Sequence, residues 1–251
     1  SEEVVGKALQ DGYREKAILS TKCGLQWNDT TGSFHYKIEG EDVYRDLSPA
    51  GIRKGLEESL FRLKTDHVDI LYTHWQSIKP GFTPIEETMG ELMKLKKEGK
   101  IRAIGASNVQ ISHLEEYQKY GQLDVIQEKY SMLDRGLEKE LLPYCEEHSI
   151  AVQAYSPLEQ GLLTGKFTME TVLRPGDVRN GQKWWNPENR ATVLSMLNGW
   201  KDLEEKYNCS VGNLVIAWTI RRGTNFSVLC GSRKVEQVSE NIKAGNIELD
   251  Q

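Results

Sequence analysis

The sequence has few cysteines, and their spacing supports neither a disulfide framework nor a metal site. The four thiols, those of Cys23, Cys145, Cys209 and Cys230, lie far apart and form no CxxC pair. The five histidines likewise show neither HxH nor HExxH spacing. Scattered cysteines are typical of proteins kept in a reducing compartment, and zinc sites need closely spaced ligands. We therefore expect free thiols and no bound metal ion.

Long apolar runs and a strong excess of one charge are also absent. No stretch approaches the roughly 18 apolar residues needed to cross a bilayer, and no signal peptide precedes the first expected helix. The formal net charge of -5 over 251 residues gives no basic surface for nucleic acid or an anionic membrane. These features predict a soluble, cytoplasmic protein without nucleic-acid or membrane partners, and they leave its oligomeric state open.

Apolar, β-branched segments alternate with segments of helical periodicity. The clearest strand covers residues 68–74, which are apolar almost throughout and end at His74. Further strands are expected at residues 17–22, 101–108, 123–127, 151–155 and 226–231. Helices are expected at residues 1–9, 48–63, 84–99, 111–120, 138–148, 190–206, 211–220 and 235–241. The sequence predicts long loops at residues 23–47 and 159–188, which are rich in glycine and polar residues.

This alternation predicts an α/β protein with right-handed parallel crossovers. A doubly wound sheet also fits, but such folds normally carry a glycine-rich phosphate turn after the first strand, and the sequence has none there. In a (β/α)8 TIM barrel, functional side chains gather at the carboxyl ends of the strands. Those ends hold Lys22, His74, Ser107, Asn108, Gln127, Tyr155 and residues 231–233. The barrel is therefore the better interpretation.

These strand ends and their neighbouring segments resemble the aldo-keto reductase superfamily over essentially the whole chain. The matching segments are residues 1–6, 20–22, 69–75, 99–108, 155–158, 161–166 and 231–233, followed by Gln237 and Asn241. Any one of these segments is weak evidence for the superfamily. Their order along the chain and their positions at strand ends make the whole set specific for it. Within the superfamily, the sequence is similar to the bacterial branch near the potassium-channel β-subunit-like members.

The resemblance implies that Lys22 and His74 are two members of a catalytic tetrad. The other two, an aspartate and the tyrosine that acts as the acid, precede the segment at residues 1–6 in the family, as do its first two strands. Six strands do not close a barrel of eight. We therefore expect residues 1–251 to form a single (β/α) barrel domain that is incomplete at its N-terminus.

The resemblance also implies a cofactor site. In the family, Ser107, Asn108 and Gln127 correspond to residues that hydrogen-bond the nicotinamide carboxamide, and Tyr155 to one that stacks on the ring. The residues expected to contact the cofactor are Ser107, Asn108, Gln127, Tyr155, Ser156, Pro157, Leu158, Gly161, Leu163, Lys166, Gly231, Ser232, Arg233, Gln237 and Asn241. An arginine at the start of a helix could clamp a ribose 2′-phosphate, so Arg233 favours NADP over NAD.

Several of these residues also have an ordinary structural interpretation. Lys22 alone would be a surface lysine, or the Schiff-base lysine of a barrel lyase. Ser107 and Asn108 would cap the helix that follows them. Residues 231–234 would form an exposed basic turn. The lyase interpretation is the weaker one, because it leaves the polar strand ends and residues 231–241 unexplained.

The expected function is an NADP(H)-dependent oxidoreductase that reduces aldehydes or ketones to alcohols. A buried ammonium lowers the pKa of a neighbouring phenol, which suits Lys22 to assist the family's tyrosine acid, while His74 orients the substrate carbonyl. The alternative is a cofactor-binding regulatory subunit with little turnover, which the similarity to channel β subunits suggests. The sequence does not identify the carbonyl substrate.

Overall fold

The computed structural model describes residues 1–27 and 29–250. The chain forms two compact units. The first consists of Ser1–Glu128 and Pro143–Val152, and the second of Lys129–Leu142 and Gln153–Gln251.

The first unit is built on parallel strands. These are β1 (Ser20–Cys23), β5 (Val68–Thr73), β6 (Ile101–Ser107) and β7 (Val125–Lys129), which pair in the order β1-β5-β6-β7. The register sets Lys22 beside Tyr72, Tyr72 beside Gly105, and Ser107 beside Gln127. Because the strands are parallel, their carboxyl ends meet at one edge of the sheet, as the sequence predicted.

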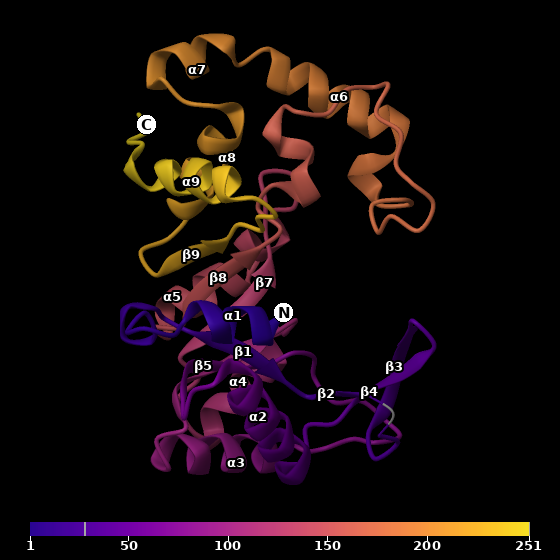
Figure 1. Cartoon of the computed structure of the whole chain (residues 1–251), viewed down its shortest axis with the longest axis vertical. Coiled ribbons are helices and arrows are strands. Elements are labelled where there is room, and N and C mark those ends of the chain that lie inside the picture. Colours follow the sequence, from indigo (N-terminus) through magenta and orange to yellow (C-terminus); the bar gives the residue numbers. More distant parts are fainter. Residues whose placement is uncertain (28, 251) are drawn as a thin grey trace. The chain divides into compact units, whose positions relative to one another are not determined.

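Helices of the first unit cover this sheet (Figure 1). They are α1 (Glu2–Ala8), α2 (Pro49–Leu63), α3 (Ile85–Lys97), α4 (Ile111–Tyr120) and α5 (Leu141–Glu147), with a short turn η1 (Arg14–Lys16). Ser48 caps the N-terminus of α2, because its hydroxyl accepts a hydrogen bond from the Gly51 N–H at 3.1 Å. The apolar side of α2 faces the core, where Ile52 and Leu56 are fully inaccessible.

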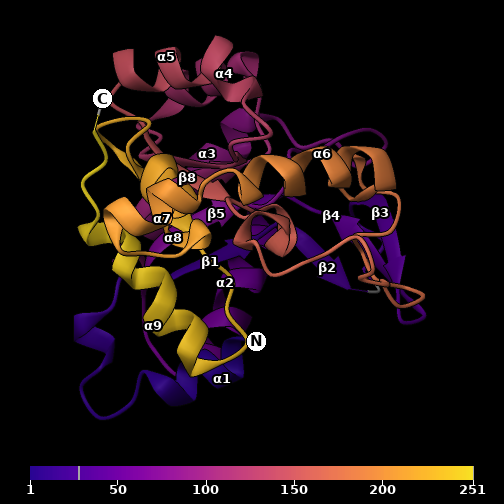
Figure 2. The same cartoon turned by 90° about the horizontal axis from the view of Figure 1, so that it is seen from above.

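The prediction of a loop at residues 23–47 is wrong. This segment forms β2 (Leu25–Trp27), β3 (Ser33–Ile38) and β4 (Glu41–Arg45), an antiparallel sheet in the order β2-β4-β3. Glu39 and Gly40, with φ of 50° and 90°, form the turn between β3 and β4. Two positive φ values in a two-residue turn match the twist of a hairpin, which explains why the polar segment pairs. Both Figure 1 and Figure 2 show β3 and β4 to one side of β1 and β5.

The second unit is mainly helical. Strand β8 (Ala151–Tyr155) leads into it, and its elements are η2 (Gly136–Lys139), η3 (Glu159–Thr164), η4 (Lys183–Trp185), α6 (Pro187–Asn198), α7 (Lys201–Tyr207), α8 (Val211–Ile220), β9 (Phe226–Leu229), α9 (Val235–Lys243) and η5 (Ala244–Asn246). The helix predicted at residues 190–206 is two helices, because the chain turns at Gly199 and Trp200. In the core of the second unit, Leu162, Leu163 and Trp185 pack with Leu197 and Val215.

Across the described residues, no helix is both long enough and apolar enough to cross a membrane. The four cysteines are free thiols.

Candidate functional site

The predicted catalytic pair lies at the carboxyl ends of β1 and β5. The His74 N–H donates a hydrogen bond to the Cys23 carbonyl at 3.0 Å, so His74 follows directly from the pairing of these strands. Lys22 Nζ lies 5.9 Å from the centroid of the Tyr72 ring. The structure therefore brings Lys22 and His74 to neighbouring strand ends.

Burial and charge keep the His74 ring neutral. Burial, and after it the positive charge of Lys22, lowers the pKa of His74 to about 4. Burial also lowers the pKa of Lys22. A neutral imidazole carries one N–H donor and one acceptor nitrogen. At neutral pH, His74 is thus able to donate a hydrogen bond to a carbonyl oxygen beside a lysine ammonium.

The three predicted carboxamide-binding residues lie next to this pair. Ser107 Oγ donates to the Gln127 carbonyl at 2.7 Å, and Asn108 Nδ2 donates to the His74 carbonyl at 2.8 Å. Asn108 adopts a left-handed conformation, with φ of 58°. Ser107 and Asn108 do not cap α4, whose N-cap is Gln110. The carboxyl ends of β5, β6 and β7 are therefore tied together through these side chains.

A buried network that sequence reasoning missed lies beneath these residues. The Tyr117 hydroxyl, on α4, donates to Gln76 Oε1 at 2.9 Å and lies 3.2 Å from Thr73 Oγ1. Gln76 Nε2 in turn lies 3.4 Å from the Ser107 carbonyl. Thr73 and Tyr117 are fully buried. No local sequence pattern marks Gln76, Thr73 and Tyr117 as a group, because their partners lie far apart along the chain.

Glu128 is a second residue that the sequence did not single out. Its Oε1 accepts a hydrogen bond from the Val109 N–H at 2.8 Å. Burial raises the pKa of Glu128 to about 7. The carboxyl group therefore supports the turn that holds Asn108.

In the second unit, the predicted residues at 155–166 differ in exposure. Tyr155 and Ser156 line a pocket of about 370 Å³ together with Lys129, Glu159 and Trp184. Leu163 is fully buried in the core of this unit, including its backbone. Gly161 has φ of 100°, a conformation that glycine adopts readily. Pro157, Leu158 and Lys166 occupy the same segment.

The predicted phosphate site lies at the start of α9. Gln237 Oε1 accepts hydrogen bonds from the N–H groups of Arg233 and Lys234, at 2.7 and 3.1 Å. Asn241 Nδ2 donates to Ser232 Oγ at 3.2 Å. These residues, with Gly231, are exposed or nearly so. The structure thus brings together the residues predicted at 231–241.

An acidic residue lies near this site. Hydrogen bonds from Arg179 lower the pKa of Asp177 to about 2, and the charge of Arg233 contributes to the same shift. The Arg179 guanidinium also stacks 4.8 Å from the centroid of the Trp185 ring. The ion-pair partner of Asp177 is thus Arg179, at 2.6 Å.

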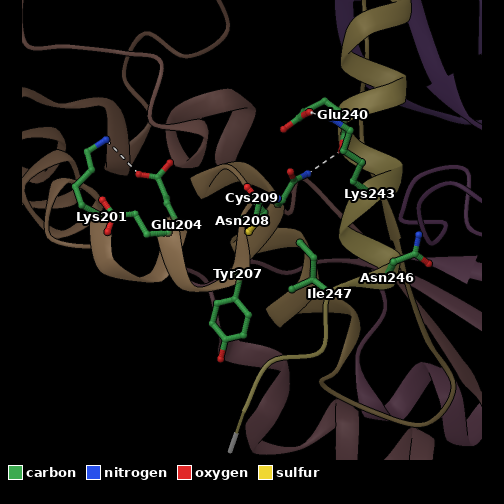
Figure 3. Close-up of a pocket in the computed structure, with 11 residues that line it drawn as sticks. Lys201, Glu204, Tyr207, Asn208, Cys209, Glu240, Lys243, Asn246 and Ile247 are labelled. Carbon is green, nitrogen blue, oxygen red and sulfur yellow. Dashed lines mark hydrogen bonds and ion pairs between the residues drawn. The ribbon is translucent and has the colours of Figure 1, made fainter.

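A larger pocket of about 720 Å³ also belongs to the second unit (Figure 3). Four of its charged side chains pair with one another: Lys201 binds Glu204 at 3.2 Å, and Lys243 binds Glu240 at 2.9 Å. Asn213 Nδ2 donates to the Glu240 carbonyl at 2.7 Å. None of the predicted site residues lines this pocket. Among the described residues, no group of three or more histidine, cysteine or acidic side chains is arranged to hold a metal ion.

Comparison with known proteins gives consistent matches over the whole chain. The model of the Aldo/keto reductase family matches residues 1–251. The NADH-specific methylglyoxal reductase of Escherichia coli (strain K12) is 48% identical over 249 residues, which are 99% of this chain and 76% of that protein. An aldo-keto reductase of Bacillus subtilis (strain 168) is 34% identical over 240 residues, 95% of this chain and 68% of that protein.

Solved structures match in the same way. Glycerol dehydrogenase from Gluconobacter oxydans has a TM-score of 0.86 at 35% identity, and the match covers 97% of this chain and 71% of that one. An aldo/keto reductase from Klebsiella pneumoniae, solved with NADP and acetate, has a TM-score of 0.68 at 27% identity. That match covers 99% of this chain and 71% of the Klebsiella chain. The predicted α/β barrel class is confirmed by these matches.

Proposed function

Because the chain belongs to the aldo/keto reductase family, whose members are oxidoreductases that reduce carbonyl compounds with a nicotinamide cofactor, we propose that it reduces small aldehydes or ketones to alcohols. The observation that supports this most directly is the placement of Lys22 and His74 at adjacent strand ends, beside Ser107 and Asn108. The branch near the channel β subunits stays a prediction.

The chain's residues would orient the carbonyl and manage its proton. A bound reduced nicotinamide would supply the hydride. His74, neutral because of its lowered pKa, would donate a hydrogen bond to the carbonyl oxygen. The Lys22 ammonium would favour the ionised form of a neighbouring phenol, and so make that phenol a better proton donor near neutral pH. Removal of a positioned acid–base group typically lowers the rate about 10²- to 10⁴-fold.

We further propose roles for the cofactor-binding residues. Ser107, Asn108 and Gln127 would hold the carboxamide and so determine which face of the ring meets the substrate. Tyr155 would stack on the ring. Residues 156–166 would follow the pyrophosphate, and residues 231–241 would contact the adenosine end.

NADH is the cofactor that we propose, although the arginine at position 233 alone favours NADPH. Gln237 already uses the N–H groups of Arg233 and Lys234, which a phosphate would otherwise bind. The E. coli relative that is 48% identical is named NADH-specific, which agrees with this choice.

The test is a steady-state assay of the full-length protein with NADH and NADPH, using methylglyoxal and a panel of other aldehydes and ketones. We expect NADH oxidation that depends on the carbonyl compound and is lost in Lys22→Met. Fluorescence titration of the same variant should still detect NADH binding. Tight NADH binding without turnover of any carbonyl would instead favour the regulatory-subunit alternative.

The cofactor choice has its own test. Arg233→Ala should weaken NADPH binding about ten- to a hundred-fold, because it removes a charge-assisted contact to the phosphate. The same change should hardly alter NADH binding. Equal effects of Arg233→Ala on both cofactors would show that Arg233 does not meet the 2′-phosphate.

A further inference from the structure

The small sheet formed by β2, β4 and β3 carries an irregularity at His35. The pairing of β3 with β4 shifts register between Phe34 and Tyr36, so His35 is an extra residue in the strand. Such bulges turn a side chain out of the regular alternation and are frequent next to active sites. The His35 ring accordingly lies 5.4 Å from the Trp75 ring, next to the predicted catalytic His74.

His35 and Trp75 together hold the side chain of Arg45. The Arg45 guanidinium lies 5.0 Å from the centroid of the Trp75 ring. Arg45 Nε and Nη2 lie 3.1 and 3.0 Å from His35 Nδ1, and Nη1 donates to the Gln76 carbonyl at 3.3 Å. Arginine carries no acceptor, so His35 Nδ1 must be the acceptor and the imidazole must be neutral.

The charge of Arg45 has no carboxylate partner among the described residues. All three of its hydrogen bonds go to neutral acceptors. By contrast, Lys37 and Lys54 in the same part of the chain pair with Asp42 and Asp29, at 3.2 and 3.1 Å. A partly buried cation without a counterion is costly, and an arriving anion relieves that cost.

The hydrogen-bonding capacity of Arg45 is also incomplete. A guanidinium has five N–H groups, and three of the Arg45 groups are used, so two remain. Stacking on Trp75 and bonding to His35 fix the plane of the group in advance. A preorganised guanidinium with free N–H groups is suited to carboxylate or phosphate.

We propose that Arg45 binds an anionic group of the carbonyl substrate, a carboxylate or a phosphate, and thereby selects substrates that carry one. This proposal rests on the proposed function, because it assigns Arg45 to the site of His74. His74 would meet the carbonyl oxygen while Arg45 meets the anion at the other end of the same small molecule. Preferred substrates would be oxoacids or phosphorylated aldehydes.

Matched pairs of substrates test the proposal by kinetics. One pair is 4-oxobutanoate and its methyl ester, and the other is glyceraldehyde 3-phosphate and glyceraldehyde. We expect the wild-type full-length protein to prefer the charged member of one pair. A preference in the first pair would identify the bound anion as a carboxylate, and a preference in the second would identify it as a phosphate. Arg45→Gln should lower kcat/KM for this charged member about ten- to a hundred-fold, mainly through KM. Activity on the neutral member should hardly change, which also shows that the variant folds.

Two further variants sharpen the comparison. Arg45→Lys keeps the charge but not the planar fork, so its kcat/KM should be intermediate. Lys37→Gln removes an exposed positive charge from the same sheet and should leave the preference for the anion unchanged. The proposal would be overturned by a wild type that shows no preference in either pair. It would also be overturned if Arg45→Gln lowered kcat/KM equally for the charged and the neutral member.

A binding measurement separates this proposal from the proposed function. Succinate and inorganic phosphate are anions that cannot be reduced, and calorimetric titration measures their binding without turnover. We expect one of them to bind the wild type and to bind Arg45→Gln at least ten times more weakly, the lower end of the kinetic effect. Such binding without reduction of any carbonyl would contradict the proposed function and leave the anion site standing. Equal binding to both proteins would overturn the anion site.

Discussion

Burial is the main cause of the lowered pKa of His74, and the charge of Lys22 adds to it. We expect Lys22→Met to raise the pKa of His74 from about 4 towards its ordinary value of 6.5, because a nearby positive charge disfavours the imidazolium. NMR titration of the histidine rings measures this change. Lys37→Met serves as the control, because Lys37 pairs with Asp42. An unchanged His74 pKa in Lys22→Met would mean that the two side chains do not interact.

The lowered pKa of His74 also makes the fold sensitive to acid. The folded chain binds this proton less readily than the unfolded chain does. The contribution of His74 to the free energy of unfolding is therefore complete above pH 6.5 and is lost as the pH falls towards 4.

Gly105 of β6 is required by the ring of Tyr72. A Cβ atom at position 105 would overlap atoms of that ring. We expect Gly105→Ala to lower the free energy of unfolding by about 1–3 kcal/mol, the usual effect of overpacking a core. At Gly90 on α3, an added Cβ atom would meet nothing within 4 Å beyond the backbone of its own helix. Gly90→Ala should therefore raise the free energy of unfolding by about 0.5–1 kcal/mol. Urea unfolding measures the free energy of unfolding of both variants. If Gly105→Ala lowers it by less than about 0.5 kcal/mol, as a surface substitution would, the overlap with Tyr72 is contradicted.

At the scale of elements, α4 is joined to the end of β5 by the Tyr117 hydroxyl. Tyr117→Phe leaves Gln76 Oε1 without its buried donor. We expect the free energy of unfolding to fall by about 1–3 kcal/mol, the penalty for an unsatisfied buried polar group. Tyr120→Phe, at the exposed end of the same helix, should change it by less than about 0.5 kcal/mol. Similar values for both variants in denaturant unfolding would refute the role of this hydrogen bond.

The turn after β6 should respond to pH through Glu128. Its folded pKa of about 7 exceeds the ordinary 4.5, so the folded chain retains a proton that the unfolded chain releases. The carboxyl group therefore weakens the fold increasingly as the pH rises from 4.5 through 7. Glu128→Gln, whose amide oxygen can still accept from the Val109 N–H, should raise Tm more at pH 8 than at pH 5. The same increase at both pH values would exclude titration of Glu128 as the cause.

Elements with a strong hydrophobic period could be predicted from the sequence. The strand at residues 151–155 and the helices at 111–120 and 211–220 have the predicted bounds. The sheet at residues 25–45 could not be recognised by period, because few of its residues are buried. Its usable signal is the Glu39–Gly40 turn between β-branched or aromatic neighbours, which is short and easily missed in a polar segment.

The candidate site was predictable only where a residue ends a strand. Lys22, His74, Ser107 and Gln127 could be placed at one sheet edge because parallel strands align their carboxyl ends. Gln76, Tyr117 and Glu128 gain their importance from burial and from partners distant in sequence, which no local pattern reveals. Arg45 is hidden for a further reason, because it lies in the segment whose composition predicts a loop.

At the scale of the whole molecule, the single-domain expectation stays a prediction, which unfolding can test. The chain forms two compact units, and replacing Trp27 and Trp75 with phenylalanine leaves tryptophan only in the second. If the barrel is one cooperative domain, tryptophan fluorescence of this variant and far-UV circular dichroism should give one midpoint. Two separate midpoints would mean that the units unfold independently.

The side chain of Gln237 bears on how cofactor preference can evolve. It occupies the acceptor position at the Arg233 and Lys234 N–H groups. If a 2′-phosphate binds there, as the sequence predicts, the phosphate must displace a competitor that belongs to the protein itself. Because the Gln237 side chain is tethered to the same helix, it competes at a high effective concentration. The gain in NADPH binding is therefore only the difference between the hydrogen bonds that the phosphate forms and those that Gln237 gives up. A switch between the two nicotinamide dinucleotides would then need no new loop. On the proposed cofactor binding, substitution at position 237 alone would shift the balance between the two cofactors.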